Sequence, residues 1–387
     1  MSKVVFFCIP AHGHTNPTLG VVRELIRRGH QVWYYGYSPF QEKIESAGAA
    51  FVACDSFDAE AKLTKEEGER LGDDLALATR VLVDTTLALD ETVCRHMEEI
   101  QPDCIVADSM AVWGKAAARK LGIPFVSSTT TFAFNKESAR VMKQSFGQVA
   151  KMILSMGKIQ KNIKRLQEVG YPIHSVLDLI QNDNDTDTIV YTSPEFQPCA
   201  DSFSEKYSFV GPILRDAETA VEKTGEKLVY VSLGTVKSGK ADFYRRCIKD
   251  LSGYQVILSV GRDFDLSQLG EIPENVTAVP FVDQMAVLKR ADAFVTHCGM
   301  NSVSEAIACE VPLVLWPQTT EQGGVARRAE ELGAGLRLED VKDLRQAVDT
   351  VLNDGKYRDS VHAIAESFHR CSGAKGAADK IEEVCRR

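Results

Sequence analysis

The sequence lacks the features that mark proteins of membranes and of nucleic acids. No stretch of it approaches the run of about 18 apolar residues that a membrane-spanning helix requires. Its 45 lysines and arginines are outnumbered by 54 aspartates and glutamates, which gives a formal net charge of -9. Nucleic acids and anionic lipid surfaces both bind clustered cations. We therefore expect no nucleic-acid partner and no integral membrane association.

The spacing of the ten cysteines argues against a metal or redox motif. No two of them form a C-x-x-C pair, which argues against a zinc ribbon or a dithiol redox motif. The first residues have neither a basic leading segment nor an apolar run long enough for a secretory signal. We therefore expect a cytoplasmic location, where cysteines stay reduced and serve as small core residues. Neither a metal ion nor a cofactor is expected.

Apolar runs alternate with amphipathic ones along most of the 387 residues. Domains usually span about 100–200 residues, so two domains are expected. Strand–helix–strand units imply parallel sheets that helices cover on both faces. The strands that we expect are 4–9, 32–35, 104–107 and 125–128 in a first series, and 228–233, 256–260, 277–280, 293–296 and 313–316 in a second.

The polar stretch Asp216–Glu226 separates the two series and is typical of a linker. It divides the chain into parts with the following expected bounds: a first domain over 1–205, a linker over 206–226, a second domain over 227–372 and a last helix over 373–387.

Two helical stretches of the first domain can be outlined from local signals. Asn16 is a natural N-cap and Pro17 a natural first helical residue, which predicts a helix over 17–28. The stretch 136–170 has a helical pattern but breaks the strand–helix alternation. We interpret it as an insertion.

The segment Phe294–Glu305 runs from a buried strand, through a turn that contains a glycine, into a helix. A helix N-terminus presents backbone N–H groups and the positive end of a dipole, so this turn predicts an anion site. His297 stands where its ring can donate to a diphosphate, and Glu305 can accept hydrogen bonds from a ribose diol. The same pattern is also that of an ordinary capped helix after a strand.

The residues around this segment favour the ligand-binding interpretation. Phe281 precedes it as an aromatic plate, and Glu321 and Gln322 follow it as an acid–amide pair. A nucleotide-sugar needs these parts, because its base stacks, its diphosphate takes donors and its sugar hydroxyls take a carboxylate and an amide.

On these residues, the segment Phe281–Gln322 resembles the nucleotide-sugar signature of the UDP-glycosyltransferase superfamily, and most closely that of the bacterial macrolide-type glycosyltransferases. The resemblance implies the GT-B fold, in which two doubly wound, Rossmann-like α/β domains with parallel sheets face each other across a cleft. It implies that the last helix packs back on the first domain. It also implies a UDP-sugar donor, and UDP-glucose on the strength of the Glu321–Gln322 pair.

The resemblance assigns donor-binding roles residue by residue. Phe281 stacks on uracil, Val282 offers its backbone to the uracil edge, and Gln284 and Glu305 lie at the ribose. The positions that match diphosphate contacts are His297, Gly299, Asn301 and Ser302, with Ser232 and Thr235 nearby. The positions that match donor-sugar contacts are Glu321, Gln322 and Thr130.

Two positions depart from the family pattern. Phe281 replaces the commoner Trp, and Asp283 replaces a common Pro. Neither change removes a proposed side-chain function, but both bear on donor affinity and on the choice of base.

The turn 10–17 after the first strand has no G-x-G-x-x-G, which weakens a dinucleotide-binding interpretation. In the resemblance His14 is the catalytic base and Asp108, at the carboxyl end of a strand, orients it; His12 has no counterpart. A neutral imidazole can take the proton of an acceptor hydroxyl, while a buried carboxylate on its other nitrogen fixes the tautomer. We therefore expect a single displacement with inversion and no metal.

The acceptor cannot be chosen from the sequence among macrolides, flavonoids, sterols and phenols. Its pocket is expected along apolar positions of the first domain and the 136–170 insertion. The positions are Met110, Trp113, Phe132 and Phe134. A monomer and a homodimer both stay open.

Other interpretations stay open too. One is a catalytically silent UDP-sugar- or ligand-binding protein, and another is a different sugar-nucleotide enzyme of the same architecture, such as an epimerase. A third is an NTPase, because 234–241 nearly spells a P-loop; its last position is Ala241, which lacks the hydroxyl that binds Mg²⁺. Asp263 and Asp265 have the spacing of a metal-binding D-x-D, and we interpret them as a loop cap.

Overall fold

The computed structural model describes residues 1–387 except 72–73, 142–145, 181, 183, 225–226 and 235–240. The chain divides into two compact units. Unit 1 comprises residues 1–191, 197–213 and 372–387, and unit 2 comprises 192–196 and 214–371. Neither unit is therefore one continuous stretch of chain.

Unit 1 is built on a seven-stranded parallel sheet in the part of the chain that the structure describes, in the order β3-β2-β1-β4-β5-β6-β7. Its strands are β1 (Lys3–Phe7), β2 (Gln31–Gly36), β3 (Ala50–Ala53), β4 (Cys104–Asp108), β5 (Phe125–Thr129), β6 (Thr188–Val190) and β7 (Tyr207–Phe209). The strand order reverses between β1 and β4. Ligand sites of open α/β sheets lie outside the carboxyl ends of the strands at such a point.

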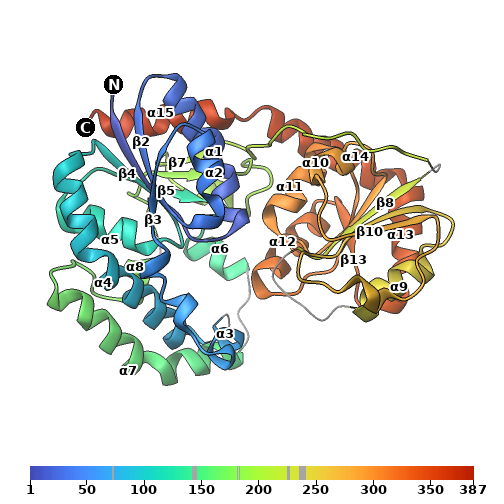
Figure 1. Cartoon of the computed structure of the whole chain (residues 1–387), viewed down its shortest axis with the longest axis horizontal. Coiled ribbons are helices and arrows are strands. Elements are labelled where there is room, and N and C mark those ends of the chain that lie inside the picture. The colour runs from blue at the N-terminus through green and yellow to red at the C-terminus, as the bar shows by residue number, and fades with distance from the viewer. Residues whose placement is uncertain (72–73, 142–145, 181, 183, 225–226, 235–240) are drawn as a thin grey trace. The chain divides into compact units, whose positions relative to one another are not determined.

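Helices cover both faces of this sheet (Figure 1). The helices α1 (His12–Arg27) and α15 (Gly373–Cys385) pack together on one face. The helices α4 (Leu75–Ile100), α5 (Val112–Leu121) and α7 (Phe146–Glu168) pack together on the other. Shorter helices complete the unit: α2 (Gln41–Ser46), α3 (Lys65–Arg70), α6 (Lys136–Val141) and α8 (Val176–Ile180).

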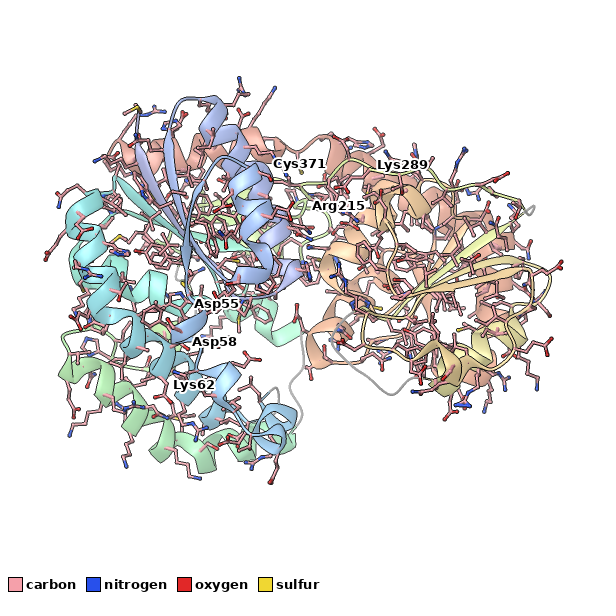
Figure 2. All side chains as sticks on the ribbon, in the orientation of Figure 1. Asp55, Asp58, Lys62, Arg215, Lys289 and Cys371 are labelled. Atoms are coloured by element: carbon pink, nitrogen blue, oxygen red, sulfur yellow. The ribbon has the colours of Figure 1, made fainter. Side chains whose placement is uncertain are left out.

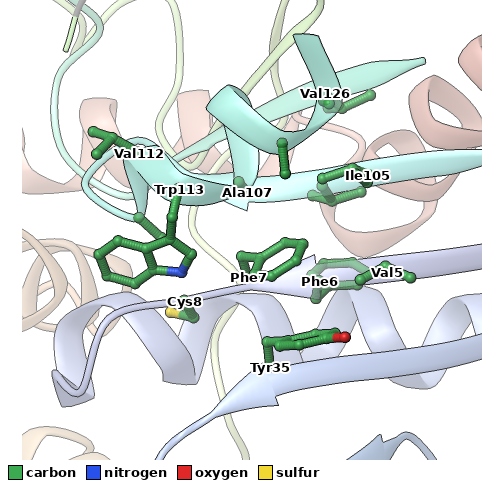
Figure 3. Close-up of a cluster of buried hydrophobic side chains, with 14 of the residues drawn as sticks. Val5, Phe6, Phe7, Cys8, Tyr35, Ile105, Ala107, Val112, Trp113 and Val126 are labelled. Atoms are coloured by element: carbon green, nitrogen blue, oxygen red, sulfur yellow. The ribbon is translucent and has the colours of Figure 1, made fainter. Parts of the chain in front are cut away.

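The core of unit 1 lies where β1 meets β2, β4 and α5 (Figure 3). The rings of Phe7 and Tyr35, on neighbouring strands, stack with their centroids 4.4 Å apart. Gly114 lets α5 approach the sheet closely, because a Cβ there would lie 2.6 Å from the Cβ of Ala107 and 2.9 Å from the ring of Phe7.

The helix α1 begins five residues earlier than the sequence predicts. The prediction took Asn16 as the cap and Pro17 as the first residue, whereas the cap is Ala11 and the helix starts at His12. A proline removes only its own N–H, and the turn before it is held by the N–H groups of His14 and Thr15, which donate to the carbonyl of Ala11.

Unit 2 contains a six-stranded parallel sheet over the residues that are described, in the order β10-β9-β8-β11-β12-β13. Its strands are β8 (Leu228–Ser232), β9 (Gln255–Ser259), β10 (Val276–Val279), β11 (Ala293–Thr296), β12 (Leu313–Leu315) and β13 (Gly335–Arg337). Again the order reverses, here between β8 and β11.

The sheet of unit 2 also lies between two helical layers (Figure 1). The helices α9 (Ala241–Asp250) and α13 (Leu344–Asn353) share a core with alternate residues of the strands. The other layer consists of α10 (Gln284–Leu288), α11 (Met300–Ala308), α12 (Thr320–Glu331) and α14 (Gly355–His369). On that side Tyr230 of β8 stacks on Phe294 of β11, with ring centroids 4.6 Å apart.

Every strand named from the sequence exists, with ends within two residues of the expected ones. The strands that the sequence did not indicate are short ones of three or four residues: β3, β6, β7 and β13. The range 206–226, expected as a linker, begins with β7 as part of the first sheet, and the chain enters unit 2 after Ile213. The expected insertion 136–170 contains α6 and α7, and α7 packs along α4.

None of the helices in the described ranges combines the length and the apolar character needed to cross a membrane.

The helix α15 and the residues that follow it are anchored in unit 1 by ion pairs to the buried Asp187. Asp187, next to β6, accepts from Lys380 at 2.9 Å and from Arg387 at 2.5 Å. Burial alone would raise the pKa of Asp187, but these two cations hold it below its ordinary value. Arg28, the C-cap residue of α1, also pairs with the exposed Asp379 of α15 at 2.6 Å.

Asp187→Asn is expected to lower the free energy of unfolding of unit 1 by about 3 kcal/mol at pH 7, because it leaves Lys380 buried without its main counter-charge. Since the folded pKa is depressed, this contribution is complete above the unfolded value of about 3.9 and is lost as the pH falls through the folded pKa. Urea unfolding at pH 7 and pH 3.5 measures both effects. The control Asp379→Asn removes an exposed partner and should cost far less; equal losses in the two variants would contradict the assignment.

Candidate active site

In unit 1 the carboxyl ends of β1 and β4 lie side by side, because Phe7 pairs in register with Ala107. His14 follows β1 in the first turn of α1, and Asp108 is the last residue of β4. The Nδ1 atom of His14 lies 2.7 Å from Oδ2 of Asp108. The carboxylate is buried, whereas the imidazole keeps 16% of its side-chain surface exposed. The structure thus has the contact that the predicted base and its orienting acid require.

Further hydrogen bonds fix this pair. The second oxygen of Asp108, Oδ1, accepts the backbone N–H of Met110 at 2.9 Å. The hydroxyl of Thr130, just beyond β5, lies 3.0 Å from Nδ1 of His14. A carboxylate is an acceptor only, so the tautomer that fits is the one with the proton on Nδ1 and the lone pair on Nε2. The imidazole is therefore oriented to accept a proton at Nε2.

Sequence comparison placed Thr130 at the donor sugar, and that role stays a prediction, since the structure shows only its contact with His14. The four expected acceptor residues divide into two classes. Met110 and Phe134 are exposed at 47% and 43%, so a ligand can reach them. Trp113 and Phe132 are buried, and Trp113 belongs to the core around Phe7 (Figure 3).

In unit 2 the connection from β11 to α11 is a tight turn. Cys298 has a positive φ of 68°, which is uncommon for a residue with a side chain. Gly299 is the N-cap of α11 and offers no side chain to the first N–H groups of the helix. Asn301 and Ser302 lie in the first turn and are partly exposed. Such an N-terminus is suited to an anion.

Two glycines make room for the ring of His297, which is 9% exposed. A Cβ at Gly234 would lie 2.7 Å from Nε2 of His297, and one at Gly299 would lie 2.6 Å from the same atom. Any larger residue at either position must displace the ring. The imidazole of His297 is therefore held beside the start of α11, where the sequence predicts a group that donates a hydrogen bond to the diphosphate.

Glu305 lies at the end of a hydrogen-bond chain inside unit 2. Gln284 donates from Nε2 to Glu305 at 2.6 Å and to the hydroxyl of Ser302 at 3.3 Å. Tyr230 donates to Oε1 of Gln284 at 3.1 Å. Burial raises the pKa of Glu305, and the hydrogen bond from Gln284 opposes this only in part. The chain holds a carboxylate with acceptor capacity to spare, as a diol ligand needs.

Phe281 is 60% exposed, a high value for an aromatic side chain, and follows β10 at the carboxyl edge of the sheet. The guanidinium carbon of Arg262 lies 5.4 Å from the centre of its ring. Val282 is partly buried. The exposed ring is available for stacking, as the sequence predicts for a base.

Asp283, one of the two departures from the family pattern, has a structural role. It accepts the backbone N–H groups of Glu218 and Thr219 at 2.6 and 3.0 Å, and it faces Arg215, labelled in Figure 2, at 3.4 Å. Burial works against the charge, but these donors hold the pKa of Asp283 below its ordinary value. The carboxylate thus fixes the segment that enters unit 2.

The other predicted donor contacts are placed as follows. Ser232 ends β8, and its carbonyl accepts the N–H of His297 at 3.3 Å. Glu321 is exposed in the first turn of α12, and Gln322 accepts the N–H of Gln318 at 2.8 Å. Thr235 and most of the near-P-loop 234–241 lie outside the described residues.

The D-x-D motif of Asp263 and Asp265 caps a short helix, as the sequence predicts. The side chain of Asp265 accepts the N–H of Ser267 at 3.0 Å and caps a short 3-10 helix. Across the described ranges, no group of three or more histidine, cysteine, aspartate or glutamate side chains is arranged to hold a metal ion.

Sequence reasoning missed two contributors to the site. Tyr230 was assigned only to a strand, although its hydroxyl orients Gln284. Gly234 was treated as part of a decoy motif, although its lack of a side chain makes room for His297. The positive φ of Gly234, 69°, is the kind of requirement that a glycine after a strand can indicate.

Comparison with known proteins places this geometry in context. A profile described as UDP-glucoronosyl and UDP-glucosyl transferase matches residues 173–373. An uncharacterized UDP-glucosyltransferase of Bacillus subtilis (strain 168) is 32% identical, over 100% of this chain and 98% of its own. The oleandomycin glycosyltransferase of Streptomyces antibioticus is 29% identical over 98% of this chain and 90% of its own.

Among solved structures, the calicheamicin glycosyltransferase superimposes with a TM-score of 0.81, at 27% identity, over 100% of this chain and 99% of its own. The two parallel sheets with their flanking helices are those of GT-B glycosyltransferases. The predicted fold class is therefore confirmed, and so is the resemblance to macrolide-type glycosyltransferases.

Glu305→Gln is expected to stabilise the protein at pH 8. Because the folded pKa of Glu305 is raised, its favourable contribution is present below the unfolded pKa and is lost as the pH rises through the folded pKa. The amide removes the buried charge and keeps an oxygen for Gln284. We expect a melting temperature about 2–4 °C higher at pH 8, corresponding to on the order of 1 kcal/mol, and a smaller gain at pH 4.5.

Differential scanning fluorimetry at the two pH values makes this measurement. Glu310→Gln serves as the matched control, because Glu310 has an exposed side chain. A melting temperature of Glu305→Gln below that of the wild type at pH 8 would show that the ionised carboxylate stabilises the fold.

Proposed function

The chain belongs to the UDP-glucoronosyl and UDP-glucosyl transferase family, and from this premise we propose that it transfers glucose from UDP-glucose to a hydroxyl of a small lipophilic acceptor. The observation that carries the proposal is the contact of 2.7 Å between Nδ1 of His14 and the buried Asp108. A protein that only bound the nucleotide-sugar would have no use for an oriented base in the other unit.

The first step is activation of the acceptor. A hydroxyl is a weak nucleophile at neutral pH, and Nε2 of His14 takes its proton as the oxygen attacks the anomeric carbon. Asp108 holds the tautomer with the proton on Nδ1 and stabilises the imidazolium that forms. Such general-base assistance typically accelerates a reaction about 10²–10⁴-fold.

The second task is stabilisation of the leaving group. As the glycosidic C–O bond breaks, negative charge develops on the diphosphate of UDP. His297 and the N-terminus of α11 supply donors for it, with Gly299, Asn301, Ser302 and Ser232 around them. These groups supply the charge stabilisation, so we propose a reaction without a metal ion or cofactor.

The remaining donor contacts follow from the same site. Phe281 offers its exposed ring to uracil, and the backbone of Val282 offers hydrogen bonds to the uracil edge. Glu305, oriented by Gln284, accepts from the ribose diol. Glu321, in the exposed first turn of α12, and Gln322 bind the hydroxyls of the hexose, which supports glucose as the sugar.

For the acceptor we propose a small lipophilic molecule with a free hydroxyl, such as a macrolide, flavonoid, sterol or phenol. Relatives are named for oleandomycin and calicheamicin, both of them natural products. The exposed Met110 and Phe134 supply apolar surface in the unit that carries His14. We further propose that the enzyme works in the cytoplasm.

His14→Ala is expected to lower kcat by at least about 10²-fold while UDP affinity stays within about twofold, because the base is lost and the nucleotide site is intact. Asp108→Asn should also lower kcat strongly, because an amide can stabilise the wrong tautomer. Release of UDP with a flavonoid or phenol acceptor, with and without EDTA, gives the rates, and calorimetry with UDP gives the affinity.

The substitution His12→Ser provides the control, since His12 is a histidine of the same turn without a proposed role. His12→Ser should keep most of the activity. If wild-type protein binds UDP-glucose but releases no UDP with any acceptor, the protein is a silent binding protein and the proposed activity is wrong.

The product is expected to have the opposite anomeric configuration from the donor. A single attack on the face opposite to the leaving UDP converts an α-linked sugar into a β-glycoside. Proton NMR of the glucoside measures the coupling of the anomeric proton, and a large diaxial coupling is expected. A small coupling would show retention and would require a covalent or front-face mechanism.

A further inference from the structure

Arg262 and Phe281 stand next to each other at the carboxyl edge of the sheet in unit 2. Arg262 follows β9 and Phe281 follows β10, which are neighbouring parallel strands. The two connections are joined beyond the strands, because the N–H of Gly261 donates to the carbonyl of Pro280 at 3.1 Å. Their side chains are both exposed, and the guanidinium lies 5.4 Å from the ring centre.

The backbone that carries Arg262 is fixed on both sides. Gly261 adopts a φ of 97°, which favours glycine, and Phe264 packs edge-on against Tyr244 of α9 with ring centroids 5.4 Å apart. Asp265 caps the 3-10 helix that follows. Within the described residues no carboxylate lies within ion-pair distance of the guanidinium of Arg262, which lies over the ring of Phe281.

We propose that Arg262 is a base-binding residue: its planar guanidinium stacks on one face of the nucleobase while Phe281 stacks on the other. The inference rests on the proposed function, because it takes the ring of Phe281 as the base platform. Guanidinium groups stack well on aromatic faces. An exposed arginine side chain can move out from the ring as the base enters, whereas the fixed backbone keeps it within reach.

This arrangement would compensate for the smaller ring of Phe281, which departs from the Trp of the family pattern. A phenyl ring offers less stacking area than an indole, and a second plane on the opposite face of the base adds to it. Stacking from two sides recognises the flat base rather than the phosphates. Arg262 would then set donor affinity through the nucleobase alone.

The topology argues against the other use of an arginine, which is binding the diphosphate. The expected anion site follows β11, and β8 lies between β11 and β9 in the sheet. Neighbouring strands are about 4.8 Å apart, so Arg262 and the start of α11 are separated by about 10 Å along the sheet edge. Arg262 therefore lies on the side of the base.

The test compares Arg262→Ala with Arg290→Ala. Arg290 is also exposed, but it precedes β11 at the opposite edge of the sheet, so its removal makes the same charge change away from the site. Calorimetry with UDP should show about 5- to 30-fold weaker binding for Arg262→Ala and no change for Arg290→Ala. Arg262→Lys, which keeps the charge without the plane, should recover little of the loss.

Inorganic pyrophosphate, tested as a competitor of UDP, distinguishes contacts to the base from contacts to the phosphates. Its affinity should be unchanged in Arg262→Ala. A double-mutant cycle with Phe281→Leu should be non-additive, because each plane holds the base against the other. Melting temperatures of all variants, measured in parallel, establish that they are folded.

The possible outcomes distinguish failure of this inference from failure of the proposed function. Wild-type affinity for UDP in Arg262→Ala overturns the inference, and so does an equal weakening of UDP and pyrophosphate, which indicates general attraction of anions. If the wild-type protein binds no UDP at all, it is the proposed function that fails. Non-additive loss of UDP binding with intact pyrophosphate binding supports the base-binding role.

Discussion

The proposed chemistry depends on one buried carboxylate. Asp108 is held at the end of a central strand, where Oδ1 accepts the backbone N–H of Met110 and Oδ2 accepts the Nδ1–H of His14. Burial of an ionised acid is costly unless both oxygens have donors. The close packing of β1, β4 and α5 makes that environment, and the imidazole is oriented as a result. The core of unit 1 therefore supports the active-site geometry as well as the fold.

In unit 2 the candidate site residues are oriented without a histidine–aspartate pair. The polar groups that we propose for nucleotide binding are held in place there by space left around a ring and by hydrogen bonds. The glycines at 234 and 299 leave space for the ring of His297. Tyr230 of β8 orients Gln284 at the start of α10, and Gln284 in turn donates to Glu305, whose pKa burial raises. In the proposed role of Glu305 as a ribose ligand, affinity for the donor and stability of the fold oppose each other at that residue.

Much of this arrangement could be predicted from sequence. Apolar runs such as 293–296 mark central strands, and the turn with a glycine after this run led to the predicted anion site. By contrast, β6 and β7 are three residues long and follow polar stretches, so their sequences do not distinguish them from loops. The start of α1 was misplaced because a proline after the first turn resembles a helix start. The Tyr230–Gln284 contact joins residues far apart in the chain, and no local signal reports it.

The discontinuous make-up of the units bears on how the protein can be divided. The last residues belong with the first ones, since α15 packs on α1 and its Lys380 and Arg387 reach Asp187. A fragment that stopped before residue 372 would keep all of unit 2 and yet expose the side of α1 that packs on α15 in unit 1. Proteolytic removal of residues 372–387 would thus destabilise unit 1 around α1 first, although the two segments lie far apart in the sequence.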